Sequence, residues 1–172
     1  ADVNQFLEQR VKDKTKELRE YVEKIEILIN NMAQAVFAIN PEGIIIDPVS
    51  QFSEKIFGEK IEGKSIWSTL YKDLDQADKD YATIQFGFGV VFHADDLQWL
   101  MVGDTFPTRF LIQDTFGRKK SLKASMSPIY DSGLCEKIMF IIEDVTELEK
   151  LEADIKKQRQ QNALKIEKLQ SI

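Results

Sequence analysis

The chain has 172 residues, of which 30% are charged, and its formal net charge is -6. This acidic balance, with Lys and Arg dispersed among acids, argues against binding to nucleic acid or to an anionic membrane surface. The single cysteine, Cys135, cannot form an intrachain disulfide, which fits a reducing, cytoplasmic compartment. No run approaches the ~20 apolar residues of a membrane span and no signal peptide opens the chain, so we expect no membrane contact by this segment.

Residues 1–33 carry a heptad pattern without Pro or Gly. Steps of three and four residues place apolar side chains at seven of nine positions in the row Asn4, Leu7, Val11, Lys14, Leu18, Tyr21, Ile25, Leu28 and Met32. The row extends over roughly 43 Å at 1.5 Å per residue, which is longer than a domain of this size usually covers. The pattern favours the seam of a parallel homodimeric coiled coil over a single amphipathic helix lying on its own domain.

Residues 147–172 predict a second coiled-coil helix, with two competing registers. Regular stepping gives a seam with a polar middle, made of Leu148, Leu151, Ile155, Gln158, Asn162, Lys165, Leu169 and Ile172. A four-residue stutter after Ile155 gives instead Arg159, Asn162, Ile166 and Leu169. Asn162 belongs to both registers, and a buried Asn selects register at some cost in stability. The end is either a two-register switch or a weak, frayed helix, and both interpretations stay open.

The middle of the chain, residues 34–146, is long enough for one domain with its own core. Two β-rich runs at 36–39 and 44–47, separated by a Pro/Gly turn, predict a hairpin. A short helix with a glycine stop is expected at 52–58. The apolar residues of 66–71 predict a second short helical piece.

Three strands are expected at the end of this domain, at 108–114, 122–126 and 137–144. Turns at Phe116-Gly117-Arg118 and Asp131-Ser132-Gly133 connect them into an antiparallel meander. Because Ile138 to Ile142 form one apolar run, both faces of the last strand should be covered. The helices of the domain cover one face, and the N-terminal helix or a partner subunit covers the other.

The segment 73–107 fits two patterns. Apolar residues recur at helical spacing from Ala77 to Val91, whereas Ile84 to Phe92 also alternate like a strand. We favour a helix because the pattern reaches back to Ala77, although Gly87 and Gly89 each cost about 1 kcal/mol relative to Ala.

Five apolar side chains are candidates for a small-molecule pocket: Phe37, Trp67, Phe88, Phe92 and Met126. The same side chains would equally fill a core and leave no cavity.

The order of these elements, ending in Asp144-Val145-Thr146-Glu147, resembles a PAS domain. Further matching residues are Asn31-Met32, Val36-Phe37-Ala38-Ile39, the turn at Gly43-Ile44-Ile45, and Ser127-Pro128-Ile129. The resemblance covers roughly residues 30–150 and implies an α+β fold, with a PAS-like five-stranded antiparallel sheet, short helices on one face, and flanking N- and C-terminal coiled-coil helices.

In PAS sensors the Asp-x-Thr element couples the last strand to the output helix. The resemblance therefore implies a signal-coupling role for Asp144 and Thr146. Thr146 and Glu149 also match the S/T-x-x-E capping box of a helix N-terminus, which is compatible with that role and with a cap alone.

The segments Leu7-Glu8-Gln9-Arg10-Val11 and Lys14-Thr15-Lys16-Glu17-Leu18 look like the signalling helix that follows membrane-embedded or HAMP segments in bacterial receptors. This resemblance implies a membrane-tethered parent protein with a downstream output domain, either a histidine kinase or a cyclase. We expect a dimeric cytoplasmic sensor or relay module. The alternatives are a haem- or small-ligand-binding sensor and a purely structural dimerisation module.

Cofactors and catalysis have little support in the sequence. A haem-bearing PAS domain uses a His on its long helix, but His93 precedes a polar turn at Ala94-Asp95-Asp96. Flavin photochemistry needs a Cys in the helical core, whereas Cys135 is expected in the turn between the last two strands. No spacing of metal ligands and no nucleophile with a base other than His93 is present, so we expect neither a metal nor an active site.

Overall fold

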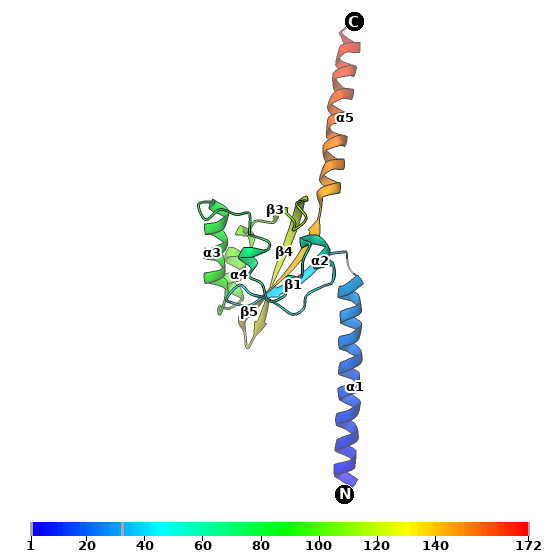
Figure 1. Cartoon of the computed structure of the whole chain (residues 1–172), viewed down its shortest axis with the longest axis vertical. Coiled ribbons are helices and arrows are strands. Elements are labelled where there is room, and N and C mark those ends of the chain that lie inside the picture. Colours follow the sequence, from blue (N-terminus) through cyan, green and yellow to red (C-terminus); the bar gives the residue numbers. More distant parts are fainter. Residues whose placement is uncertain (1, 32, 172) are drawn as a thin grey trace.

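A computed structural model of the chain describes residues 2–31 and 33–171. Two long helices, α1 (Asp2–Asn31) and α5 (Thr146–Gln170), project in opposite directions from a globular domain (Figure 1). The domain contains the strands β1 (Ala35–Ile39), β2 (Ile45–Ile46), β3 (Arg109–Gln113), β4 (Lys119–Asp131) and β5 (Leu134–Asp144). Its helices are α2 (Phe52–Phe57), α3 (Lys79–Val91) and α4 (Asp96–Val102), with short 3-10 turns η1 (Ile66–Ser68) and η2 (Gly103–Thr105).

The five strands form one antiparallel sheet in the order β2-β1-β5-β4-β3. The predicted hairpin and the three-strand meander are confirmed, because Gly-containing turns join the neighbouring strands and fix both locally. The inner face of the sheet is apolar. Phe37 of β1 and Phe140 of β5 stack there with ring centroids 5.2 Å apart, and both are fully buried.

The outer face of β5 is less covered than the sequence predicts. Ile138, Phe140 and Ile142 are buried, but Met139 and Ile141 between them are only half-buried. The N-terminal helix does not cover them, because α1 runs away from the sheet (Figure 1). Coverage by a partner subunit stays a prediction.

The ambiguous segment is helical, as favoured from its pattern, and α3 begins two residues later than Ala77. Asp78 caps it by accepting a hydrogen bond from the backbone N–H of Asp80 at 3.0 Å. Gly87 serves packing, since a Cβ built there would lie 2.5 Å from the ring of Phe106. At Gly89 a Cβ would meet nothing within 4 Å.

Helix α4 was not expected, because its first residues read as a polar turn. Asp95 instead caps the helix by accepting from the backbone N–H of Leu97 at 3.2 Å. Cys135 is also placed differently: it is the second residue of β5 rather than part of the turn, and it is fully buried. The expected second short helical piece is only the turn η1, followed by the buried Leu70 and Tyr71.

Candidate functional site

The joint between β5 and α5 lies where the domain meets its exit helix, with only Val145 between the two elements. The backbone N–H of Val145 donates to the carbonyl of Ser121 in β4 at 2.9 Å. The backbone N–H of Ser121 donates in turn to the hydroxyl oxygen of Thr146 at 2.9 Å. The start of α5 is therefore hydrogen-bonded to β4 as well as covalently joined to β5.

Asp144 caps the exit helix. One of its carboxylate oxygens accepts from the backbone N–H of Thr146 at 3.0 Å and from the hydroxyl of Thr146 at 2.5 Å. The predicted capping box is wrong, because the backbone N–H of Thr146 that Glu149 would accept is already bonded to Asp144. The amide of Glu149 itself makes the helical bond to the carbonyl of Val145 at 2.9 Å.

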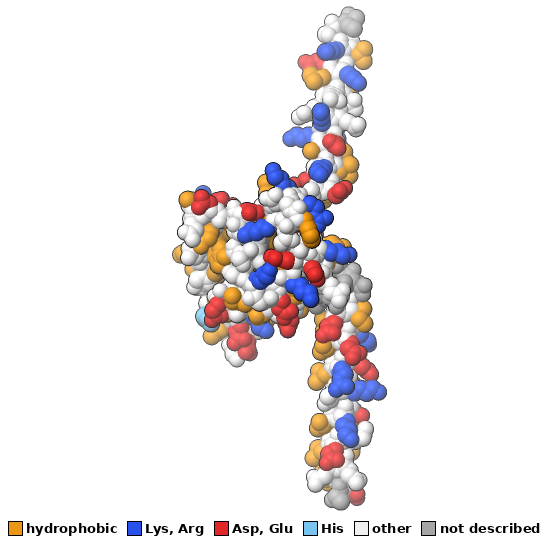
Figure 2. All heavy atoms as spheres, in the orientation of Figure 1, with side chains coloured by type: hydrophobic (Ala, Val, Ile, Leu, Met, Phe, Trp, Pro, Cys, Tyr) orange, Lys and Arg blue, Asp and Glu red, His pale blue; other side chains and the backbone are white. Residues whose placement is uncertain are grey.

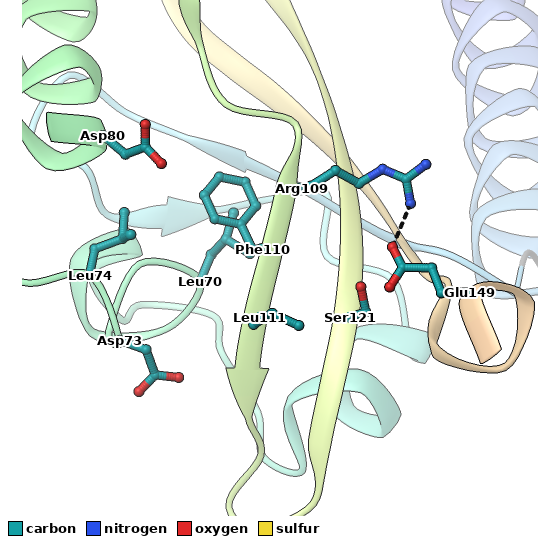
Figure 3. A pocket seen from close by; sticks show the side chains of 9 residues that line it. All are labelled: Leu70, Asp73, Leu74, Asp80, Arg109, Phe110, Leu111, Ser121 and Glu149. Atoms are coloured by element: carbon teal, nitrogen blue, oxygen red, sulfur yellow. Dashed lines mark hydrogen bonds and ion pairs between the residues drawn. The ribbon is translucent and has the colours of Figure 1, made fainter. Parts of the chain in front are cut away.

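Glu149 instead ties the exit helix to the edge strand of the sheet. Its carboxylate lies 3.0 Å from the guanidinium of Arg109 in β3, as the dashed line in Figure 3 shows. Both side chains are about half exposed, so the pair contributes roughly 0–1 kcal/mol by itself. The ion pair nevertheless connects α5 to β3, in addition to the hydrogen bond between Thr146 and Ser121 of β4.

A pocket of about 470 Å³ adjoins this ion pair. Its apolar lining comes from Leu70, Leu74, Phe110 and Leu111, and its acids are Asp73, Asp80 and Glu149 (Figure 3). Asp73 accepts from the backbone N–H of Gln113 at 3.2 Å. The hollow therefore lies against the free edge of β3 and reaches the first turn of α5.

Three of the five expected pocket residues lie together. Trp67, Phe88 and Phe92 line a surface hollow of about 350 Å³ that also includes His93. Phe37 is not part of it, since its ring is buried against Phe140 in the core. Met126 lines a different hollow, beside Trp99.

One polar group in the core lacks a partner. The hydroxyl of Tyr71 is buried and has no hydrogen-bond partner among the described residues. Burial also raises the pKa of this phenol far above its ordinary value. The ring packs between Phe110 at 5.2 Å and Trp67 at 5.3 Å.

Both long helices expose apolar side chains in the single chain, as the orange groups along them in Figure 2 show. On α1 the predicted seam residues are 41% to 66% exposed: Leu7, Val11, Leu18, Tyr21, Ile25 and Leu28. Met32 lies outside the described residues. On α5, Leu151, Ile155 and Asn162 are exposed in one uninterrupted helix, and Ile172 lies outside the described residues.

Solved structures of PAS and light-oxygen-voltage domains share this fold. The PAS domain of an HTR-like protein from Haloarcula marismortui has a TM-score of 0.54 at 21% identity, over 77% of this chain and 98% of that one. A sensory box histidine kinase/response regulator from Burkholderia thailandensis has a TM-score of 0.51 at 14% identity, over 81% and 98%. An RNA-binding light-oxygen-voltage receptor has a TM-score of 0.58 at 11% identity, over 80% of this chain and 37% of that one.

These likenesses establish that the chain has a PAS fold. The sequence matches no protein-family model and no curated protein. Among residues 2–31 and 33–171, no helix combines the length and apolarity needed to cross a membrane. Within the same residues, no group of three His, Cys, Asp or Glu side chains is arranged to hold a metal ion.

Proposed function

We propose that this chain is a dimeric relay module that passes a conformational change of its PAS domain through α5 to an output domain of its parent protein. The observation that carries the proposal is the joint itself. Ser121 of β4, Asp144 of β5 and Thr146 of α5 share one set of hydrogen bonds. A change in the sheet therefore cannot leave the start of the exit helix unaffected.

The exposed apolar rows on α1 and α5 support dimerisation. Exposed Leu and Ile side chains on each helix, and Val side chains on α1, are costly in water and would be buried in a two-stranded coiled coil. The same proposal makes the module cytoplasmic, its parent membrane-tethered, and the output domain a histidine kinase. The structural neighbour from a sensory box histidine kinase supports that choice of output.

The exit helix has two competing seams. At 100° per residue, Leu151, Ile155 and Ile166 lie within a sector of about 60° on a straight helix, whereas Lys165 lies further round. We therefore propose that the straight helix of this structure favours the register with Ile166 in the seam, and that the second register lies close in energy. A difference of a few kcal/mol between two PAS conformations is enough to exchange them.

Disulfide crosslinking of variants with one added cysteine tests the relay. Lys165→Cys and Ile166→Cys report the two registers, and the native Cys135 does not interfere because it is fully buried. We expect efficient crosslinking through position 166, and a changed ratio when Thr146→Val breaks the joint. The proposal fails if the dimer crosslinks at neither position. It also fails if the ratio of crosslinking at 165 to crosslinking at 166 is the same with and without Thr146→Val, because α5 would then be a passive connector.

A further inference from the structure

The hollow that contains Trp67, hereafter the Trp67 pocket, is lined by residues of three separate elements. The turn between β1 and β2 contributes Glu42, the turn η1 contributes Trp67, and the second half of α3 contributes Gln85, Phe88 and Gly89. Its volume of about 350 Å³ is at the lower end of the range for small-molecule sites. It lies apart from the pocket beside Glu149, with which it shares no lining residue.

Several polar side chains line this pocket. Among the described residues, the side chains of Glu42, Trp67, Gln85 and His93 make no hydrogen bond, although each has a donor or an acceptor. They come from separate segments of the chain: the β1–β2 turn, η1, α3 and the residues after α3. A few polar groups around an aromatic lining are typical of a ligand site.

The aromatic rings of the pocket are held at fixed angles to one another. Trp67 and Phe88 pack edge to face with centroids 6.0 Å apart, and Phe88 and Phe92 do the same at 5.9 Å. Gly89, on the same helix, leaves open space where a side chain would stand. The hollow therefore lies where Gly89 has no side chain, beside the packed rings of Trp67, Phe88 and Phe92.

The charge of the lining selects among ligands. Glu42 is the acidic residue in the lining of the Trp67 pocket, and the lining residues include neither Lys nor Arg. An anion would meet no counter-charge here, whereas a cation would be attracted by the carboxylate and by the faces of the aromatic rings. We propose that the Trp67 pocket binds a small aromatic amine in its cationic form.

The pocket is also connected to the exit helix. His93 has a left-handed backbone, with φ of 64°, and its backbone N–H donates to the carbonyl of Cys135 at 2.9 Å. The N–H of Cys135 donates to the carbonyl of Ala94 at 2.8 Å. Because β5 then runs without interruption to Asp144, a ligand that moves the end of α3 would pull on the strand that starts α5. This link rests on the proposed relay function, whereas the binding itself does not.

Three indole compounds test the binding with charge as the only large difference: tryptamine is cationic, 3-methylindole neutral and indole-3-propionate anionic. We expect titration of the full chain with tryptamine to give saturable amide shifts at Gly89 and His93 in NMR spectra. Tryptamine should bind at least about fivefold more tightly than indole-3-propionate. The absence of saturable shifts at millimolar tryptamine, or equal affinity for the two, would overturn the proposal.

Two variants with matched controls locate the site. Glu42→Gln should weaken tryptamine about fivefold without affecting 3-methylindole, whereas Glu147→Gln on α5 should affect neither. Gly89→Leu should abolish binding of all three compounds, since it fills open space in a helix that tolerates leucine. Ala82→Leu adds the same side chain at an exposed position of α3 outside the pocket and should bind like the unmodified chain. Unchanged binding by Gly89→Leu would place the ligand elsewhere and refute the proposal.

The crosslinking ratio at positions 165 and 166 separates binding from relay. A tryptamine-dependent change in this ratio supports the connection through β5. Tight binding with an unchanged ratio would sustain the Trp67 pocket and refute the connection. If the crosslinking ratio responds to Thr146→Val but none of the indole compounds binds, the relay function stands and the proposed ligand site is refuted.

Discussion

Replacing Thr146 with valine removes one hydroxyl from the joint and keeps the shape of the side chain. The backbone N–H of Ser121 donates to that hydroxyl, and Ser121 is only 8% exposed. Valine would leave this donor buried without an acceptor, which costs about 1–3 kcal/mol. Asp144 loses less, because its exposed carboxylate regains water and keeps the bond from the backbone N–H of residue 146.

We therefore expect Thr146→Val to lower the free energy of unfolding by about 2 kcal/mol, measured by urea denaturation. Amide exchange at Ser121 should accelerate by about 30-fold, the factor that corresponds to this energy. Asp144→Ala should cost about 1 kcal/mol as a lost cap while Ser121 stays protected by the remaining hydroxyl.

Thr146→Ser is the matched control, since it keeps the hydroxyl and should protect the Ser121 amide as threonine does. If Thr146→Val left both the unfolding midpoint and the exchange of Ser121 unchanged, the hydroxyl would not hold the joint. The coupling derived from this hydrogen bond would then have no physical basis.

Three further predictions concern the α1 seam, the glycines of α3 and the carboxylate of Asp114. Leu18→Lys with Ile25→Lys would bury charge in the α1 seam at several kcal/mol, so light scattering should show the mass falling toward the 19.8 kDa of one chain; a persisting dimer would refute the seam. Gly89→Ala should stabilise α3 by about 1 kcal/mol in urea, and Gly87→Ala should destabilise by about 1–3 kcal/mol because its Cβ meets a phenyl ring at 2.5 Å; equal effects would contradict this packing. Burial tends to raise the pKa of Asp114, but hydrogen bonds from the Arg118 backbone and from the Lys120 and Arg118 side chains outweigh it and lower the pKa to about 2. Stability should therefore be lost as pH falls from about 4 toward 2, and Asp114→Asn should reduce this dependence in acid titrations followed by circular dichroism.

Much of the site was beyond the reach of sequence reasoning. The pattern Thr146 to Glu149 matches a capping box, but the bonds go to Ser121, Asp144 and Arg109 instead. Ser121 and Arg109 are 25 and 40 positions away from their partners in α5. A local pattern cannot foresee a partner that arrives through strand pairing.

The lining of the Trp67 pocket could likewise be predicted only in part from the sequence. Aromatic residues at 67, 88 and 92 were recognisable as candidates, yet Phe37 and Met126 were expected beside them and lie elsewhere. Side-chain type predicts that a residue is apolar. Which apolar residues meet depends on tertiary packing, in which Gly87 allows the ring of Phe106 to approach α3 closely.

The sequence by itself determined the strands, the turns, the long helices and the order that identifies a PAS fold, because these depend on periodicity and on turn residues within a few positions of one another. It also placed Asp144 and Thr146 where the last strand passes into the exit helix. The tertiary structure alone decided which groups those side chains bond, that Glu149 reaches β3, and that one glycine opens a hollow beside Trp67. Those features arise from contacts between distant segments, whose geometry is fixed only when the sheet and α3 have packed together.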